Sequence, residues 1–312
     1  MANNMTLPLF KLPKGATTNV LSIMSLEEQV KFVVLSKRSA KSMTAVKNEL
    51  NAPQVYCCSS FVSFCLIRPL QPNSNWMFKN GNNWRENGCS LEYFVDAIKT
   101  AFNLPFIANV TVDGNQGSRY DMNILKALRD VRNLFMYTEA APDFCKDVLN
   151  ALEPVKALFV DYGRSDMRDW HKVFIQDFDQ LSLRYTIGNE HRSKGLDDLL
   201  VINSAYIFLN CSVMDRTALI RFLKCWKTGA NPRMKYLKAA GPVALFEVDN
   251  IVRKLSATAI PAPRTFPTIS KWGWSREPVT IDNGYYVQRK DGKQATFHFP
   301  LNGILELFVS DN

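Results

Sequence analysis

The sequence predicts an α/β protein. A small N-terminal group of three helices precedes an irregular, repeat-like α/β solenoid that ends in a β-hairpin cap. Three observations carry this prediction. Four ungapped segments between Leu104 and Tyr185 share one apolar pattern, amphipathic helical stretches separate them, and an Asp-Gly turn at Asp291 joins two stretches of alternating polarity near the C-terminus.

The repeated segments begin at Leu104, Leu128, Leu152 and Ile175, and they read LPFIANVTVDG, LRDVRNLFMYT, LEPVKALFVDY and IQDFDQLSLRY. Their starts are therefore 24, 24 and 23 residues apart, and each has apolar residues at relative positions one, four, seven and nine. Positions seven and nine point to one face of a strand because side chains alternate along a strand. One strand and one helix in roughly 24 residues falls in the range of leucine-rich repeats, whose stacked units share a core.

A fifth copy, LLVINSAYIFL from Leu199, is arguable, although its third apolar slot holds Ala205. The copies also lack the Asn or Cys that usually closes a leucine-rich repeat. The position after each of their strands holds Asp, Thr or Arg instead. We therefore describe the segment as repeat-like and irregular. The alternative is an ordinary α/β domain in which the regular spacing is accidental.

The most clearly delimited helix covers residues 216–228. Asp215 is its candidate N-cap, Gly229 follows its last turn, and Pro232 prevents its continuation. Its apolar residues recur at helical spacing: Leu219, Phe222, Leu223 and Trp226. Each contributes roughly 1.5–3 kcal/mol when it is fully buried. We interpret this helix as scaffold.

After Val248 the chain changes character. Residues 255–270, LSATAIPAPRTFPTIS, are rich in Pro and indicate an extended loop. The following stretch YYVQRKDGKQATFHF alternates around Asp291-Gly292, which is a hairpin signal. LNGILELFV adds a further candidate strand, and we expect the capping hairpin over 279–310 to cover the open edge of the repeats.

The composition is that of a protein with a large core. Of the 312 residues 46% are hydrophobic, and the net charge of +9 comes from Lys and Arg that are scattered along the chain, which favours a solvated surface over a nucleic-acid footprint. The odd number of seven Cys and the absence of a signal peptide indicate free thiols in a reducing compartment. We expect a protein of the cytoplasm, the nucleus or both, with no membrane contact.

Three short helical patterns occupy the first fifty residues. The first contains Val20 and Leu21, the second follows the capping box Ser25-x-x-Glu28, and the third begins near Ser36. The segment is too short to bury much apolar surface by itself. It therefore either packs on the repeats or binds a partner.

The stretch LPKGATTNVLSIMSLEEQVKFVVLSKRSAKSM, from Leu12, resembles the F-box. The pattern of that family is matched at Leu12, Pro13, Val20, Leu21, Met24, Glu28, Val34, Leu35, Ser36, Lys37 and Arg38. Gln29 stands where an apolar residue is common, and Ser39 stands where an aromatic residue is common. The resemblance implies an F-box over residues 5–52, which docks on the adaptor subunit of a cullin-RING ubiquitin ligase.

A second resemblance lies around the helix at 216–228. The stretches DDLLVINSAYIFLN and LIRFLKCWKTGANPRMKYL look like the type-two F-box-associated domain, which is found in a large nematode family. The matching positions are Leu199, Leu200, Asn203, Ser204, Phe222, Leu223, Lys224, Trp226, Lys227, Gly229, Asn231, Pro232 and Arg233, whereas Ile220 departs from the pattern. The resemblance implies that residues 53–312 form the domain that binds a target.

The sequence carries no catalytic signature that we recognise. Its three His residues, His171, His191 and His298, are not spaced as metal ligands, and the common nucleophile and phosphate-loop motifs are absent. The weaker candidates are more simply explained as turn, core and surface residues: the loop Asp113–Gly117, the adjacent pairs Cys57-Cys58 and Asp197-Asp198, and the aromatic residues Trp272 and Trp274. We predict a protein that is not an enzyme and has neither cofactor nor metal.

These observations predict an adaptor that holds a target protein for ubiquitin transfer. The resemblance implies that the ligase adaptor is bound through eight residues: Leu12, Pro13, Val20, Leu21, Met24, Leu26, Val30 and Val34. Candidates for target binding, at strand ends and on the exposed sheet face, are Thr111, Phe135, Phe159 and Ser182. A stand-alone binding protein, whose N-terminal helices only cap the solenoid, remains an alternative. A basic nucleic-acid-binding protein is a weaker one.

Overall fold

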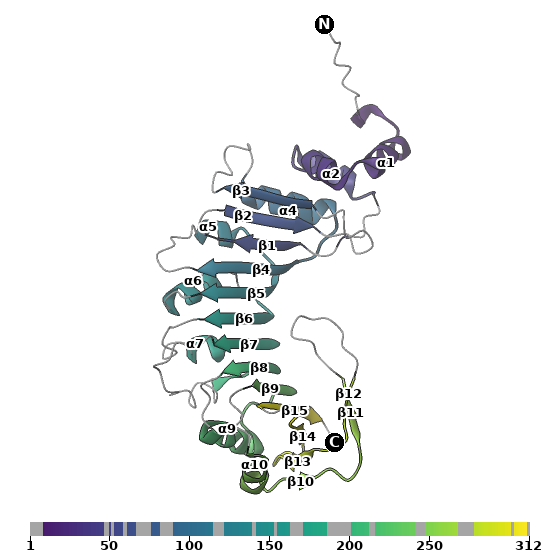
Figure 1. Ribbon diagram of the computed structural model, residues 1–312. Helices are drawn as coiled ribbons and strands as arrows, with labels where there is room; N and C mark the ends of the chain where they lie inside the picture. Colours follow the sequence, from purple (N-terminus) through teal and green to yellow (C-terminus); the bar gives the residue numbers. More distant parts are fainter. Residues whose placement is uncertain are drawn as a thin grey trace. The chain divides into compact units, whose positions relative to one another are not determined.

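The computed structural model describes 15 parts of the chain. They are residues 9–46, 50, 53–58, 61–66, 76–81, 90–114, 122–138, 142–152, 155–162, 171–185, 201–211, 216–240, 247–267, 278–300 and 303–310. The chain, whose elements are labelled in Figure 1, divides into two compact units. The first unit comprises Met1–Thr111, Arg119–Arg132 and Asn150–Pro154, and the second comprises Val112–Ser118, Asn133–Leu149 and Val155–Asn312. Each unit is described by itself.

The first unit begins with short helices. They are η1 (Leu9–Lys11), α1 (Lys14–Ile23), α2 (Leu26–Val33) and α3 (Lys37–Met43). Ser25 caps α2 in a complete capping box with Glu28, as the sequence predicts, and Ser36 caps α3 by accepting a hydrogen bond from the Ser39 backbone amide. Three N-terminal helices therefore form where their patterns place them.

A small sheet and two further helices complete the first unit. The strands are β1 (Gln54–Cys57), β2 (Phe61–Leu66), β3 (Trp76–Gly81) and β4 (Ile107–Gly114), in the order β4-β1-β2-β3. Strand β2 is antiparallel to both β1 and β3. The helices are α4 (Leu91–Ala101), which Ser90 caps as predicted, and α5 (Met122–Lys126). Helices α2 and α3 pack against α4, and the Phe64 and Phe94 rings lie 5.1 Å apart, so the helices and the sheet share one core.

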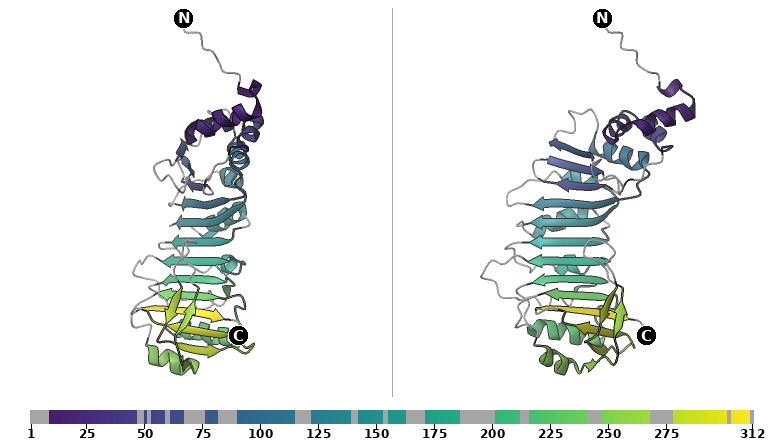
Figure 2. Two further views of the ribbon diagram at one scale, coloured as in Figure 1. Left: turned by 90° about the vertical axis from the view of Figure 1, so that its right-hand side faces the viewer. Right: turned by 45° about the vertical axis from the view of Figure 1, so that its right-hand side comes forward.

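Parallel strands form the centre of the second unit. They are β5 (Val131–Thr138), β6 (Ala157–Tyr162), β7 (Gln180–Tyr185), β8 (Tyr206–Cys211) and β9 (Tyr236–Ala240), paired in chain order. The connections contain α6 (Pro142–Leu152), α7 (His171–Phe174) and α9 (Arg216–Thr228). Helices α6 and α7 lie along the same side of the strands (Figures 1 and 2). Helices on one side of a parallel sheet bury the face of the strands that they cover.

The strand register confirms the in-phase stacking of three repeated segments. Leu134, Leu158 and Leu181, which hold the seventh position of their copies, are direct partners across β5, β6 and β7, and all three are fully buried. The next partner is Ile207, so the register of the fifth copy was wrong: Ile207, not Ala205, takes the seventh position. The insertion of two residues explains why this copy fitted the pattern poorly.

A second difference concerns the first position of the fourth copy. Leu128 and Leu152 are buried, but Ile175 is 62% exposed, and the buried residue of that turn is Phe174. Helix α7 is four residues long, and the shift of one residue along this short turn moves the apolar side chain to the core. Spacing alone therefore places the strands correctly but misses one residue of the connecting helix.

Antiparallel strands continue the sheet of the second unit beyond β9. They are β15 (Ile304–Ser310), β14 (Gln294–His298), β13 (Tyr285–Gln288) and β10 (Thr258–Ala259), in the order β9-β15-β14-β13-β10. The predicted hairpin around Asp291-Gly292 forms between β13 and β14, and Gly292 has φ +92°, which a residue with a side chain adopts at a cost. Helix α10 (Val248–Leu255) precedes β10.

The Pro-rich segment after Leu255 contains more structure than predicted. It forms β10 and β11 (Arg264–Phe266), and β11 pairs with β12 (Val279–Ile281) in a separate two-stranded sheet. Ile281 belongs to a buried cluster with Phe208, Tyr236 and Phe308, against which Ile260, Phe266 and Val279 pack. The prediction of an extended loop was wrong here because each strand is only two or three residues long and its stability comes from this tertiary contact.

Helix α9 has the extent that the sequence predicts, whereas its candidate N-cap, Asp215, lies outside the described residues. Its four stripe residues, Leu219, Phe222, Leu223 and Trp226, are 0–3% exposed. Gly229 follows with φ +118°, which glycine tolerates best. The fold as a whole is a mixture of helices and strands with a large sheet, as predicted at the level of fold class.

Candidate functional site

The eight residues predicted to bind the ligase adaptor divide by exposure. Leu21, Leu26 and Val30 are 0–5% exposed and form the core of the N-terminal helices. Pro13 is exposed, and the remaining four are partly exposed: Leu12, Val20, Met24 and Val34. Five of the eight side chains are therefore accessible to a second protein in this conformation of the chain.

Three apolar residues outside the predicted set are exposed on the same helices. Ile23 is 84% exposed, Leu35 is 75% exposed and Phe10 is 39% exposed. Ile23 is the last residue of α1, and Leu35 follows the C-cap of α2, so both lie where a 3.6-residue pattern stops being informative. The Phe10 ring lies 5.8 Å from the Phe32 ring, and the Arg38 guanidinium lies 4.6 Å from it.

Gln29 has a structural role in this region. Its side chain is fully buried, and Nε2 donates hydrogen bonds to the backbone oxygens of Leu21 at 3.0 Å and Met24 at 3.2 Å. The last carbonyls of α1 have no partner within their own helix, and the amide of Gln29 satisfies two such groups at the turn into α2. An apolar residue at this position would leave both carbonyls without these bonds.

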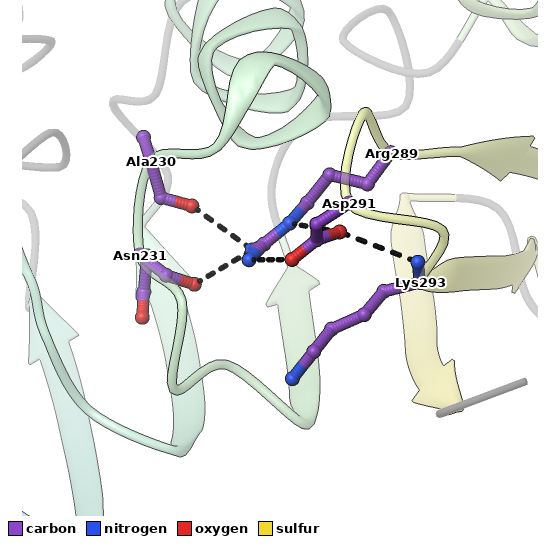
Figure 3. A network of polar contacts seen from close by, with 5 residues as sticks. All are labelled: Ala230, Asn231, Arg289, Asp291 and Lys293. Atoms are coloured by element: carbon purple, nitrogen blue, oxygen red, sulfur yellow. Dashed lines mark hydrogen bonds and ion pairs between the residues drawn. The ribbon is translucent and has the colours of Figure 1, made fainter.

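In the second unit, one buried arginine connects the end of α9 to the C-terminal hairpin. Arg289 is 5% exposed, and its Nε and Nη2 donate to the two carboxylate oxygens of Asp291 at 2.9 and 2.6 Å. Its Nη1 faces the backbone oxygens of Ala230 and Asn231 at 3.5 and 3.4 Å (Figure 3). These bonds and the burial hold the guanidinium in a fixed orientation.

Other residues of the WKTGANPR stretch also make structural bonds. Lys227 Nζ donates to the Leu255 carbonyl at 2.8 Å, which places a cation at the C-terminal end of α10. Arg233 forms ion pairs with Asp177 at 3.0 Å and Asp179 at 3.5 Å, just before β7. The motif thus connects α9, α10 and the strand entries, which confirms the interpretation of this region as scaffold.

The four residues suggested for target binding lie on strands. Thr111 is a partly exposed residue of β4 in the first unit. In the second unit Phe135, Phe159 and Ser182 are direct partners across β5, β6 and β7, on the face opposite the fully buried leucines. Their exposure is only 3–8%, and the two Phe rings stack at 4.3 Å. We call the sheet face that carries these three residues the second face.

A charged trio also lies on the second face. Lys238, Glu306 and His298 are register partners on β9, β15 and β14. Glu306 accepts from Lys238 Nζ at 2.6 Å and lies 3.3 Å from His298 Nε2. Burial by itself raises the pKa of Glu306, but the hydrogen bonds from His298 and Lys238 and their charges outweigh burial and lower this pKa to about 2. Glu306 is therefore a carboxylate at every physiological pH.

The remaining candidates offer little chemistry. Burial raises the pKa of Cys57 to about 12, so its thiol stays protonated. Within the described ranges no three His, Cys, Asp or Glu side chains gather as a metal site would require. Several sequence candidates lie outside the described residues: His191, the pair Asp197-Asp198, Trp272 and Trp274. Among the helices that the structure describes, none has the length and apolar character needed to cross a membrane.

The described residues thus include exposed apolar side chains on the N-terminal helices and a charged trio on the second face. Comparison with known families adds one finding. Residues 169–239 match the family model described as F-box associated. The matched segment contains α9, all of β9 except Ala240, and the motif that Arg289 contacts, and it supports an F-box-associated domain in the C-terminal part of the chain. No curated protein and no solved structure matches the chain.

Proposed function

We propose that this chain is a non-catalytic substrate-recognition adaptor of a cullin-RING ubiquitin ligase. The N-terminal helices, which resemble an F-box, dock on the adaptor subunit of the ligase, and the part of the chain that follows, over 53–312, binds a target protein. The match of residues 169–239 to the F-box-associated family supports the second half of this proposal. The chain needs no cofactor for this role, and it acts in the cytoplasm, the nucleus or both.

The exposure of Ile23 and Leu35 carries the first half of the proposal. Both residues are at least 75% exposed, whereas Leu21, Val33 and Met43 on the same helical segment are fully buried. A fully buried Ile or Leu contributes roughly 1.5–3 kcal/mol, so a partner that covers both gains several kcal/mol. Exposed apolar side chains on short amphipathic helices suit a groove on a second protein.

The docking surface follows from the exposures. It consists of the five accessible residues of the predicted set together with Phe10, Ile23 and Leu35. Leu21, Leu26 and Val30 are buried and stabilise the helices that carry this surface. Arg38, which lies over the Phe10 ring, adds a charge at its border.

The proposed role in ubiquitin transfer is one of proximity. The ligase supplies the activated thioester of ubiquitin, and this chain holds the target close to it. Tethering of this kind raises the local concentration of the target without any catalytic residue in the tethering chain.

We further infer that the parallel strands β5 to β9 form an irregular leucine-rich-repeat-like solenoid. The in-register leucines at 134, 158 and 181 support this inference. The antiparallel strand β15 then covers the edge of β9, which would otherwise offer unpaired backbone groups.

Co-expression with the ligase adaptor subunit tests the proposal. The variant Ile23→Asp/Leu35→Asp places two charges on the docking surface without touching a buried side chain. The matched control is Ile175→Asp, because Ile175 is 62% exposed and lies in the second unit. We expect the wild-type chain and the control to retain the adaptor subunit on an affinity column, and the double variant to lose it.

One observation favours the alternative of a stand-alone binding protein. Helices α2 and α3 pack against α4, so the N-terminal helices belong to the core of the first unit. If the double variant and the wild-type chain retain the adaptor subunit equally, or neither retains it, these helices act as a cap of the fold and the proposal is wrong.

A further inference from the structure

A row of exposed or partly exposed side chains crosses the second face. Tyr137, Asp161, Arg184 and Asn210 are direct register partners on β5, β6, β7 and β8. Tyr137 is 43% exposed, and Arg184 and Asn210 are exposed as well. We call these four residues the exposed row. Each lies two positions along its strand from the row that contains Phe135, Phe159, Ser182 and Phe208, so both rows share the same face.

Beside the exposed row, Phe135, Phe159, Ser182 and Phe208 form a row of buried side chains, which we call the buried row. Phe135 and Phe159 stack at 4.3 Å in a buried cluster with Ala157. Phe208 is buried in a second cluster, which the β11–β12 sheet covers. The packing of the buried row therefore stabilises the pairing of these strands, and the exposed row supplies the groups that another molecule can reach.

The ion pairs on this face present their cations to solvent. The side chain of Arg184 is 58% exposed, but that of its partner Asp161, at 3.6 Å, is 24% exposed. The side chain of Lys238 is 34% exposed, but that of Glu306 is 11% exposed. A surface pair as long as that of Arg184 is worth at most about 1 kcal/mol, so Arg184 can exchange its partner for another carboxylate at little cost. In both pairs the cation is therefore the member that an anionic group can reach more easily.

We propose that the exposed row binds an acidic segment of the target protein, in an extended conformation that crosses the strands. The acidic side chain pairs with Arg184, and an apolar side chain of the same segment packs on the ring of Tyr137. This inference rests on the proposed function, because it names the kind of segment that the target-binding part of the chain holds.

The spacing between the two contacts defines the segment further. Tyr137 and Arg184 lie two strands apart, and neighbouring strands are about 4.8 Å apart, so the contacts are separated by roughly 9.6 Å. A polyproline-II segment has three residues per turn and a rise of about 3.1 Å, so its side chains at i and i+3 point the same way and lie about 9.3 Å apart. A β-strand places side chains of one face only about 6.7 Å apart. The preferred segment therefore has an apolar residue three positions from Asp or Glu.

The charge of the whole chain supports an acidic partner. The net charge of +9 attracts an anionic segment and raises its rate of association at low ionic strength. Asn210 extends the exposed row by an amide that can both donate to and accept from the backbone of an extended segment, which has no internal hydrogen bonds.

Selection from a displayed library of random 12-residue peptides on the immobilised full-length chain tests this inference. Three variants are compared with the wild type: Arg184→Glu, Tyr137→Ala and the matched control Arg221→Glu. Arg221 is an exposed cation of α9 in the same unit, so the two charge reversals change the net charge equally.

We expect the wild type and Arg221→Glu to enrich peptides with Asp or Glu three positions from an aromatic or aliphatic residue. Arg184→Glu should lose the acidic residue from its enriched peptides and bind the best wild-type peptide at least tenfold more weakly. Tyr137→Ala should lose the apolar preference. The inference is overturned if the wild type enriches no sequence, if acidic residues are absent, or if Arg184→Glu enriches the same peptides. Retention of the ligase adaptor subunit, measured on the same variants, reports separately on the proposed function.

Discussion

The guanidinium carbon of Arg289 lies 5.4 Å from the centre of the Trp226 ring. Arg289 follows β13 in the C-terminal hairpin, and Trp226 lies in the last turn of α9, within the segment that matches the F-box-associated family. Asp291 fixes the orientation of the guanidinium through two hydrogen bonds (Figure 3). The contact connects two segments more than sixty residues apart in the chain, so the hairpin takes part in the fold of the matched segment.

Arg289→Lys should destabilise the second unit. Lysine keeps the charge but loses the guanidinium group that lies over the Trp226 ring and the paired bonds to Asp291. The loss of hydrogen bonds to charged groups in a buried site costs about 1–3 kcal/mol. Urea unfolding followed by tryptophan fluorescence measures the change in unfolding free energy.

Lys290→Ala is the matched control for Arg289→Lys. Lys290 is the exposed neighbour, and its backbone amide donates to the Lys227 carbonyl at 3.3 Å, a bond that survives the substitution. The control should unfold like the wild type. Equal stabilities of all three proteins would contradict a structural role for the Arg289 contact.

The stability of the second unit should fall in acid because of Glu306. The pKa of this carboxyl is lowered to about 2 from its usual value near 4.5, so the native state binds fewer protons than the unfolded state between these values. The stabilisation is present above about pH 4.5, and it is lost as the pH falls towards 2. It amounts to at most about 3 kcal/mol, because one pKa unit corresponds to about 1.4 kcal/mol.

Glu306→Gln removes this proton linkage. The difference in unfolding free energy between the wild type and Glu306→Gln should be largest near pH 6 and should shrink steadily between pH 5 and pH 2. Asp282→Asn, which alters an exposed carboxylate in the same unit, should track the wild type over this range. A difference that does not vary with pH would show that Lys238 and His298 do not hold the Glu306 charge.

Gln29→Ala should loosen the turn between α1 and α2. The substitution leaves the Leu21 and Met24 carbonyls without the bonds that the Gln29 amide donates, at a cost of about 1–3 kcal/mol. Amide hydrogen exchange should become faster in α1 and α2. The control Glu27→Ala changes an exposed residue of the same helix, and it should leave most of the protection unchanged. Identical exchange in both variants would exclude the bridging role of Gln29.

The sequence predicts those parts of the fold that local rules determine. The capping box at Ser25, the N-cap at Ser90 and the end of α9 at Gly229 follow from the residue types present. The register of Leu134 and Leu158 follows from a spacing that places strand after strand in phase. In each case one short stretch of chain contains the whole signal.

Features that depend on distant residues could not be predicted. Strands β11 and β12 are three residues each, and they form over Phe208 and Phe308, which are remote in sequence. The burial of Leu21 and Leu26 depends on how the N-terminal helices pack. The same packing leaves Ile23 and Leu35 exposed. An apolar residue needed for the fold and one available to a partner look alike in the sequence, so the candidate site could be predicted only as a region.

The central claim is that the exposed apolar residues of the N-terminal helices bind the ligase adaptor subunit. Calorimetric titration of the purified chain with that subunit tests it most directly. We expect a one-to-one complex with a negative heat-capacity change, because apolar surface is buried. The complex should be weakened at least a hundredfold by Ile23→Asp/Leu35→Asp and left unchanged by Ile175→Asp. A wild-type chain that does not bind, or a double variant that binds as tightly as the wild type, would contradict the claim.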